Sequence, residues 1–282
     1  MAIKPIPYKC IWCLEEFPKA AFTSESHVLP KCVGNKRRQV LTRGIVCDNC
    51  NGSFSHKVEH TLIEDPIFKT VVGILQLRDI NRDFIFKNVQ LGGINRFANM
   101  KSEVVPNNIT IHTEYIIKGQ TGEPDEIRNV TESKDYQKRD LALLSRAVHK
   151  IAFESLAYSL YVKNDFEVEN IDLMKEVDIF DSSFTVVRRW VRYGEPYDKV
   201  RPVLRYFDIS HVNNKIELYN WEYQLLSYEQ LVIVGMNLYG DCHYLSLTST
   251  SNRVNNDLLN LTEETIIKRP LLIIGDKLQY MK

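Results

Sequence analysis

Two cysteine pairs, each enclosing two residues, constrain this chain more than any other feature. The pairs are Cys10/Cys13 and Cys47/Cys50, which gives the pattern C-x2-C-x33-C-x2-C. A C-x-x-C loop lets two thiolates face one ion, and two such loops supply the four ligands of a tetrahedral structural zinc site. The sequence therefore predicts a zinc ion held by four thiolates, with no position left open for a substrate.

Composition restricts the class of protein without identifying a function. The 282-residue chain is 44% hydrophobic, which is enough for a real core, and its formal net charge is zero. A strongly basic chain would indicate nucleic acid by charge alone, so any nucleic-acid site here must come from a local patch. Without an apolar run of membrane-span length or a signal-peptide core, we expect a cytoplasmic protein with no membrane contact. In that compartment paired cysteines bind metal rather than form disulfides.

A histidine lies between the two cysteine pairs. Residues 24–30 read Ser-Glu-Ser-His-Val-Leu-Pro, and we expect a strand through His27. Asn51 directly follows the second pair, where we expect a helix that ends before Pro66. At about 100° per residue, Asn51 shares a side of this helix with an apolar stripe that must be buried. The stripe consists of Phe54, Val58 and Leu62. The Asn51 amide should therefore face the strand that carries His27, at a helix N-terminus that favours an anion such as phosphate.

Taken together, these residues resemble the HNH endonucleases of the zinc-knuckle type over about residues 8–68. The resemblance implies a ββα-metal fold in which His27 matches the general base. Asn51 matches the final His-or-Asn position, which helps to hold a divalent ion (Mg²⁺ or Mn²⁺) at the scissile phosphate. Thr42 occupies the position of the middle Asn of the motif, and we expect it to brace the loop by hydrogen bonding. The implied reaction is metal-assisted hydrolysis of a phosphodiester bond.

Ser26 departs from the family pattern, in which the residue before the base is often an acidic or histidine metal ligand. Ser26 itself, another residue or water must then complete the metal shell, and Glu59 is the nearest carboxylate along the helix. His56 is a further candidate ligand. Glu25 is a weaker one, because strand alternation turns it to the face opposite Ser26. His60 is weaker still, because it is rotated by about 180° from Asn51 on the helix.

A basic loop between the cysteine pairs offers contacts to the nucleic-acid backbone. Such contacts are blind to sequence and sensitive to salt, and the alternative interpretation is a solvated loop. The candidate residues are Lys31, Lys36, Arg37, Arg38 and Arg43.

The whole chain is predicted to be α+β. We expect an N-terminal HNH module with its zinc over 1–68, and a mixed helix and β-rich accessory domain over 69–282 that binds DNA, senses a ligand or forms oligomers. Periodicity and turn signals place the further elements. We expect helices over 67–75 and 140–161, a strand over 107–118, a loop over 119–138 and several strands after Phe184. Segments 188–193 and 201–207 mix basic and aromatic residues, and we interpret them as amphipathic strands, with nucleic-acid contact as the alternative.

The leading hypothesis is a metal-dependent DNA endonuclease. Association by family extends this to bacterial restriction or anti-phage defence, with a homo-oligomer or a defence-system partner. Two alternatives stay open. One is a non-catalytic zinc-knuckle module that binds nucleic acid or protein, and the other is a ribonuclease with the same centre.

Overall fold

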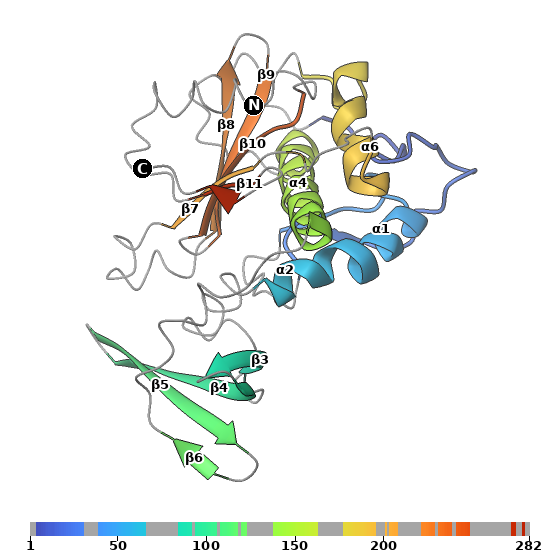
Figure 1. Ribbon diagram of the computed structural model, residues 1–282. Helices are drawn as coiled ribbons and strands as arrows, with labels where there is room; N and C mark the ends of the chain where they lie inside the picture. The colour runs from blue at the N-terminus through green and yellow to red at the C-terminus, as the bar shows by residue number, and fades with distance from the viewer. Residues whose placement is uncertain are drawn as a thin grey trace.

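A computed structural model gives the arrangement of the chain (Figure 1). It describes residues 4–30, 39–65, 84–91, 94–105, 108–117, 120–122, 138–162, 177–195, 201, 203–207, 221–228, 231–238, 241–248, 272–274 and 278–279. Over these residues helices and strands are mixed, so the α+β class is confirmed. The expected helix over 67–75 lies outside the described residues. None of the helices within the described ranges combines the length and the apolar character that a membrane span requires.

The N-terminal segment forms a short hairpin followed by a helix. Strand β1 (Ser26–His27) pairs antiparallel with β2 (Val40–Leu41), with Ser26 opposite Leu41 and His27 opposite Val40. Helix α1 (Asp48–Phe54) continues through a π-helical turn, η2 (Ser55–Glu59), into α2 (His60–Glu64). The strand through His27 is therefore confirmed, and the helix ends before Pro66 as expected. It begins three residues earlier than expected, because the second cysteine knuckle already forms its first turn.

The predicted apolar stripe faces the interior. Phe54, Val58 and Leu62 are all buried, as the four-residue spacing requires. The rings of Phe54 and Phe153 both meet Trp12 edge-on, each with its centroid 4.9 Å from that of the indole. Because Phe153 comes from a distant helix, the first knuckle shares its core with a segment far downstream.

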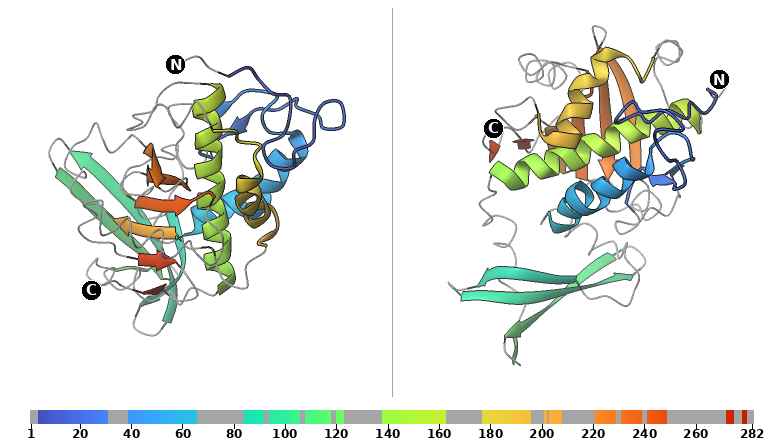
Figure 2. Two further views of the ribbon diagram at one scale, coloured as in Figure 1. Left: turned by 90° about the horizontal axis from the view of Figure 1, so that it is seen from above. Right: turned by 90° about the vertical axis from the view of Figure 1, so that its right-hand side faces the viewer.

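That distant segment is helix α4 (Lys138–Tyr161), which confirms the helix predicted over 140–161. Its last four turns, residues 147–161, are buried on every side, which is expected of a helix covered by neighbours all round. Figure 1 and Figure 2 show α4 between the N-terminal helices and the C-terminal strands, and it contacts both. The N-terminal module therefore packs directly on α4.

The C-terminal strands on the other side of α4 form one antiparallel sheet in the order β12-β11-β7-β10-β9-β8. Their bounds are β7 (Val203–Phe207), β8 (Trp221–Tyr228), β9 (Leu231–Leu238), β10 (Asp241–Ser246), β11 (Leu272–Ile274) and β12 (Leu278–Gln279). The strands predicted after Phe184 are confirmed, and β7 confirms the strand predicted over 201–207 for residues 203–207.

A second antiparallel sheet has the order β3-β4-β5-β6. Its strands are β3 (Phe84–Leu91), β4 (Ile94–Val105), β5 (Asn108–Ile117) and β6 (Gln120–Gly122). Strand β5 confirms the strand predicted over 107–118. The loop predicted over 119–138 is wrong at its start, because residues 120–122 continue the backbone ladder as β6 against β5. Residues 123–137 lie outside the described part of the chain.

The strand predicted over 188–193 is wrong, because these residues belong to helix α6 (Thr185–Tyr193). A turn, η4 (Ser182–Phe184), precedes it, and Gly194 ends it in the left-handed region at φ +77°, where glycine carries no steric cost. Buried Val187, Trp190 and Val191 follow a helical spacing. The basic and aromatic residues fit both periods over so short a run, and the glycine stop is the signal that decides.

Candidate functional site

The four cysteines of the two knuckles converge on one point. Their sulfur atoms all lie within 4.8 Å of one another, and the sulfurs of Cys13 and Cys47 are 3.7 Å apart. Zinc–sulfur bonds of about 2.3 Å place neighbouring sulfurs of a tetrahedron about 3.8 Å apart. The donor type, number and spacing therefore fit a structural zinc ion.

The clustered thiols shift one another's pKa values. Contact with the thiol of Cys10, and then with that of Cys47, raises the pKa of Cys50 far above its ordinary value. The hydrogen bond with Cys47 raises the pKa of Cys10 to about 12, whereas the same bond lowers the pKa of Cys47 to about 2. A divalent cation is what allows all four to ionise.

Asn51 contacts the segment that leads into β1. Its amide nitrogen donates to the carbonyl oxygen of Glu25 at 3.1 Å and to the hydroxyl of Ser24 at 3.3 Å. The side chain therefore faces the hairpin, as the helix periodicity indicates. The donor end of the amide is occupied, and the carbonyl end has no hydrogen-bond partner among the described residues.

Asp48 fixes the same segment, although sequence reasoning did not single it out. Its carboxylate accepts four donors, the backbone N–H and the hydroxyl of both Thr23 and Ser24, at 2.6–3.1 Å. The hydroxyl of Ser24 is the largest cause of a lowered pKa for Asp48. Sequence reasoning began the helix at Asn51 and so left Asp48 outside its first turn, and partners 24 and 25 residues upstream leave no local signal.

His27 is half-buried, and Ser26 is buried. The hydroxyl of Ser26 donates to Glu154 Oε2 at 3.0 Å, so this side chain is directed into the protein, toward α4. The backbone carbonyl oxygen of His27 accepts a 2.8 Å hydrogen bond from Lys150 Nζ, which also comes from α4. Both residues of β1 are therefore connected to a helix more than a hundred positions downstream.

A buried ionic network on α4 makes these contacts, and sequence reasoning missed it. Lys150 Nζ lies 3.0 Å from Glu154 Oε2 and 2.6 Å from Glu59 Oε1, and the side chains of Lys150 and Glu154 are 0% exposed. Burial opposes the charge on Lys150, but Glu154 and Glu59 outweigh it, so its pKa is raised. Burial also raises the pKa of Glu154, and Lys150 offsets only part of that effect. In the sequence this network appears only as a Lys–Glu pair four residues apart, a spacing that ordinary surface helices share.

Comparison with known proteins finds a family match in the N-terminal part of the chain. Residues 10–66 match the family model of the HNH endonucleases. The match confirms the resemblance drawn from the cysteine pairs, His27 and Asn51, and it indicates a nuclease. It covers the N-terminal part of the chain, here called the HNH module, and leaves the remainder unassigned. Neither a curated protein nor a solved structure matches the chain.

The structure places the other candidate residues that it describes on several elements of the HNH module. Thr42 and Arg43 are exposed in the turn after β2, and His60 is exposed on α2. Glu59 lies against Lys150, as given above. The side chain of His56 lies outside the described residues, as do Lys31, Lys36, Arg37 and Arg38.

A catalytic divalent ion needs more oxygen ligands than the described residues bring to the HNH site. Among them the carbonyl end of the Asn51 amide is the one candidate oxygen donor. The carboxylate of Glu59 is paired with Lys150 and that of Asp48 holds the loop before β1, while Ser26 turns away toward Glu154. Mg²⁺ demands six-fold coordination dominated by oxygen. The described residues alone therefore do not form a complete shell for it.

Proposed function

We propose that this chain is an endonuclease that hydrolyses DNA phosphodiester bonds, with residues 1–68 as the nuclease module. The observation that carries the proposal is the hydrogen bond from the Asn51 amide to the Glu25 carbonyl oxygen. It joins the first helix to the strand of His27, beside the cysteine cluster. The family match over 10–66 supports the same interpretation. The catalytic roles of His27 and Asn51 are assigned from their positions in the HNH motif and not from any single distance.

In this proposal His27 is the general base. Its neutral imidazole takes a proton from a water molecule near pH 7, where a histidine is matched to that task. The resulting hydroxide attacks phosphorus in line, the bond from phosphorus to the 3′-oxygen breaks, and the leaving 3′-oxygen takes a proton from a water molecule. Asn51 and Asp48 hold the segment before His27 and thereby orient the base, and Thr42 is proposed to brace the loop of the hairpin.

Two metals belong to the proposal. Zn²⁺ held by Cys10, Cys13, Cys47 and Cys50 cross-links the knuckles and contributes folding free energy. A bound catalytic Mg²⁺ or Mn²⁺ would supply positive charge that offsets the negative charge building up on the phosphate. Asn51 is the described residue that would hold it, and the substrate, water or residues such as His56 would have to complete its shell.

The remainder of the chain is proposed to serve the nuclease as an accessory domain over 69–282, in DNA binding, sensing or oligomerisation. The basic residues of the hairpin loop and Arg43 are proposed to contact phosphates. A role in restriction or anti-phage defence rests on the family resemblance alone.

A specific observation favours a second candidate, a non-catalytic zinc module that binds nucleic acid. The hydroxyl of Ser26 and the carboxylate of Glu59, both candidate metal ligands, are engaged with α4 instead. A module that had lost its catalytic ion would tolerate this arrangement. A ribonuclease with the same centre is the third candidate.

One experiment separates the three. Zinc-loaded full-length protein is incubated with supercoiled plasmid DNA, modified and unmodified, and with single-stranded and duplex RNA, each with Mg²⁺, Mn²⁺ or no added ion. The proposal predicts nicked and linear DNA only in the presence of a divalent ion, with RNA intact. Cleavage of RNA alone would support the ribonuclease. Binding of either substrate without cleavage under all conditions would support the non-catalytic module.

A further inference from the structure

We propose that Lys150 and Glu154 of α4 are positioning residues of the nuclease site. Their side chains hydrogen-bond to the strand of His27 on the side that faces α4. The inference rests on the proposed function and deepens it. It assigns a role to two side chains that lie outside the residues matched by the HNH family, in the region proposed as accessory.

The ammonium group of Lys150 uses all of its hydrogen-bond donors within this network. A lysine ammonium carries three donors, and Lys150 Nζ has three acceptors. These are the His27 carbonyl oxygen at 2.8 Å, Glu59 Oε1 at 2.6 Å and Glu154 Oε2 at 3.0 Å. One ammonium group thus connects the strand of the general base, the helix of the HNH module and α4.

Glu154 makes the matching connection to the zinc knuckle. Its Oε1 atom accepts the indole N–H of Trp12 at 3.0 Å, and its Oε2 atom accepts the hydroxyl of Ser26 at 3.0 Å. Trp12 lies between the two cysteines of the first knuckle. The carboxylate therefore fixes β1 relative to the residues that hold the zinc.

Strand β1 needs contacts from other elements because it forms few backbone hydrogen bonds with β2. Strands β1 and β2 are two residues long each, shorter than the three or more paired residues usual in proteins. Asn51 holds the carbonyl oxygen of Glu25, and Lys150 holds that of His27 two residues later. The segment is thus held at two alternate carbonyl groups, from α1 and from α4.

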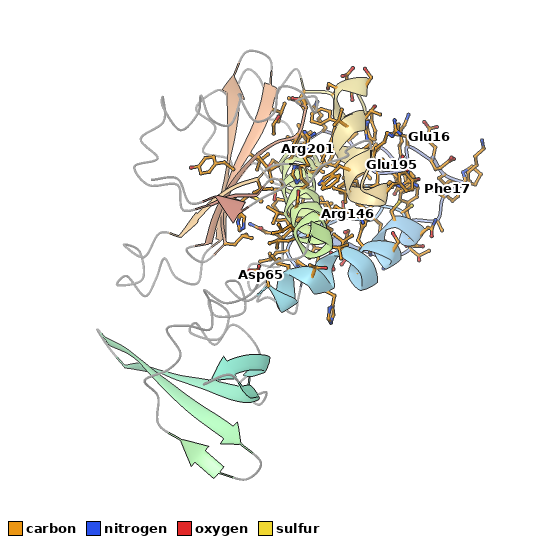
Figure 3. The ribbon with its side chains drawn as sticks, viewed as in Figure 1. Glu16, Phe17, Asp65, Arg146, Glu195 and Arg201 are labelled. Atoms are coloured by element: carbon orange, nitrogen blue, oxygen red, sulfur yellow. The ribbon has the colours of Figure 1, made fainter. Side chains whose placement is uncertain are left out.

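Positioning explains the charges better than stability does. Burying a lysine and a glutamate costs desolvation free energy, and well-packed apolar side chains in their place are often neutral or stabilising. An apolar pair would fill the same space in the core but would give no donor to the His27 carbonyl group. Figure 3 shows side chains filling the layer between α4 and the N-terminal helices, the two parts that this network joins.

The test is the double variant Lys150→Met/Glu154→Gln, which removes both buried charges together and keeps the side-chain volumes. The introduced glutamine retains an acceptor for Trp12 and a polar partner for Ser26, and Glu59, whose side chain is 17% exposed, can turn to solvent. Lys9→Met is the matched control, because Lys9 pairs with Glu16 at the surface. Thermal unfolding and zinc content report the fold, and steady-state cleavage of plasmid DNA reports kcat and KM.

The proposal predicts zinc content and unfolding temperature close to wild type in the double variant. It predicts a fall in kcat of about 10²-fold, the scale expected for a displaced catalytic group, with little change in KM. The Lys9→Met control should match wild type in every measurement. A double variant that keeps its zinc and cleaves at the wild-type rate overturns the proposal.

Two further measurements keep the proposal falsifiable. If the double variant fails to fold, Glu154→Gln alone retains Glu59 as the counterion of Lys150. The proposal then predicts a fall in kcat of about ten-fold with zinc retained, and a wild-type kcat overturns it.

Amide hydrogen exchange at Val28, whose N–H donates to Gln39 O at 3.1 Å, needs no substrate. Faster exchange at Val28 in the variant than in wild type, with exchange in α1 unchanged, supports the positioning role even if the protein cleaves no nucleic acid. Unchanged exchange at Val28 overturns the proposal.

Discussion

The indole nitrogen of Trp12 donates a 3.0 Å hydrogen bond to Glu154, across 142 positions of sequence, inside the buried core. The contact joins the first cysteine knuckle to helix α4. The knuckle therefore owes part of its stability to a helix beyond the residues that match the HNH family.

Replacing Trp12 by Phe should destabilise the protein by about 1–3 kcal/mol, because it leaves a buried carboxylate oxygen of Glu154 without its donor. The free energy of unfolding from urea titration measures the effect. Phe17→Leu is a suitable control, because Phe17 is 68% exposed and lies at the outer edge of the N-terminal segment in Figure 3. Equal stability of Trp12→Phe and wild type would show that the bond contributes nothing.

The zinc site predicts one metal ion per chain, and Cys47→Ser should lose it together with much of the cooperative unfolding transition. Metal analysis of the purified protein, before and after exposure to a chelator, gives the stoichiometry. If Cys47→Ser keeps both zinc and fold, the four-thiolate site is wrong.

Asp48 predicts a specific dependence of stability on pH. Hydrogen bonds, that from the Ser24 hydroxyl foremost, lower its pKa below the ordinary 3.8. The folded state therefore favours the ionised carboxylate of Asp48. The resulting contribution to the free energy of unfolding is fully present above about pH 4, and it is lost as the pH falls through the folded pKa. Asp48→Asn should be less stable than wild type at pH 7, by about 0.5–1 kcal/mol on the scale of helix-capping bonds. The difference should shrink toward pH 2, and a difference that grows on acidification would contradict the assignment.

Asn51 offers a test that distinguishes chemistry from packing. Asn51→Ala removes the bonds to Ser24 and Glu25 and should lower kcat by about 10²-fold. Asn51→His introduces the other residue that the HNH pattern accepts here, and it should retain more activity than the alanine variant. The two variants are compared at equal zinc content. The role of Asn51 at the metal site fails if histidine is no better than alanine.

The features predicted correctly from the sequence are those fixed by local spacing. The cysteine pattern located the cluster, and the helix period placed Asn51 toward the hairpin and Phe54 toward the core. These inferences need only the geometry of one helix and of two short loops.

The features missed depend on contacts across the fold. A Lys–Glu pair four residues apart is ordinarily a surface ion pair, and nothing near Lys150 in the sequence distinguishes its buried position from an exposed one. The contact with His27 lies 123 positions away. The helix over 188–193 was missed for a different reason, since its six residues fit a strand period equally well and the stop at Gly194 was the deciding signal.

The central claim is that His27 is the base of a phosphodiester hydrolase, and the most direct test compares wild type with His27→Ala on supercoiled plasmid in the presence of Mg²⁺ or Mn²⁺. Both proteins must carry equal zinc and unfold at the same temperature, so that a difference reports chemistry. The account predicts nicking by wild type and a loss of about 10²–10⁴-fold in the variant, the contribution expected of a general base. Equal cleavage by both proteins, or none by either, would contradict it.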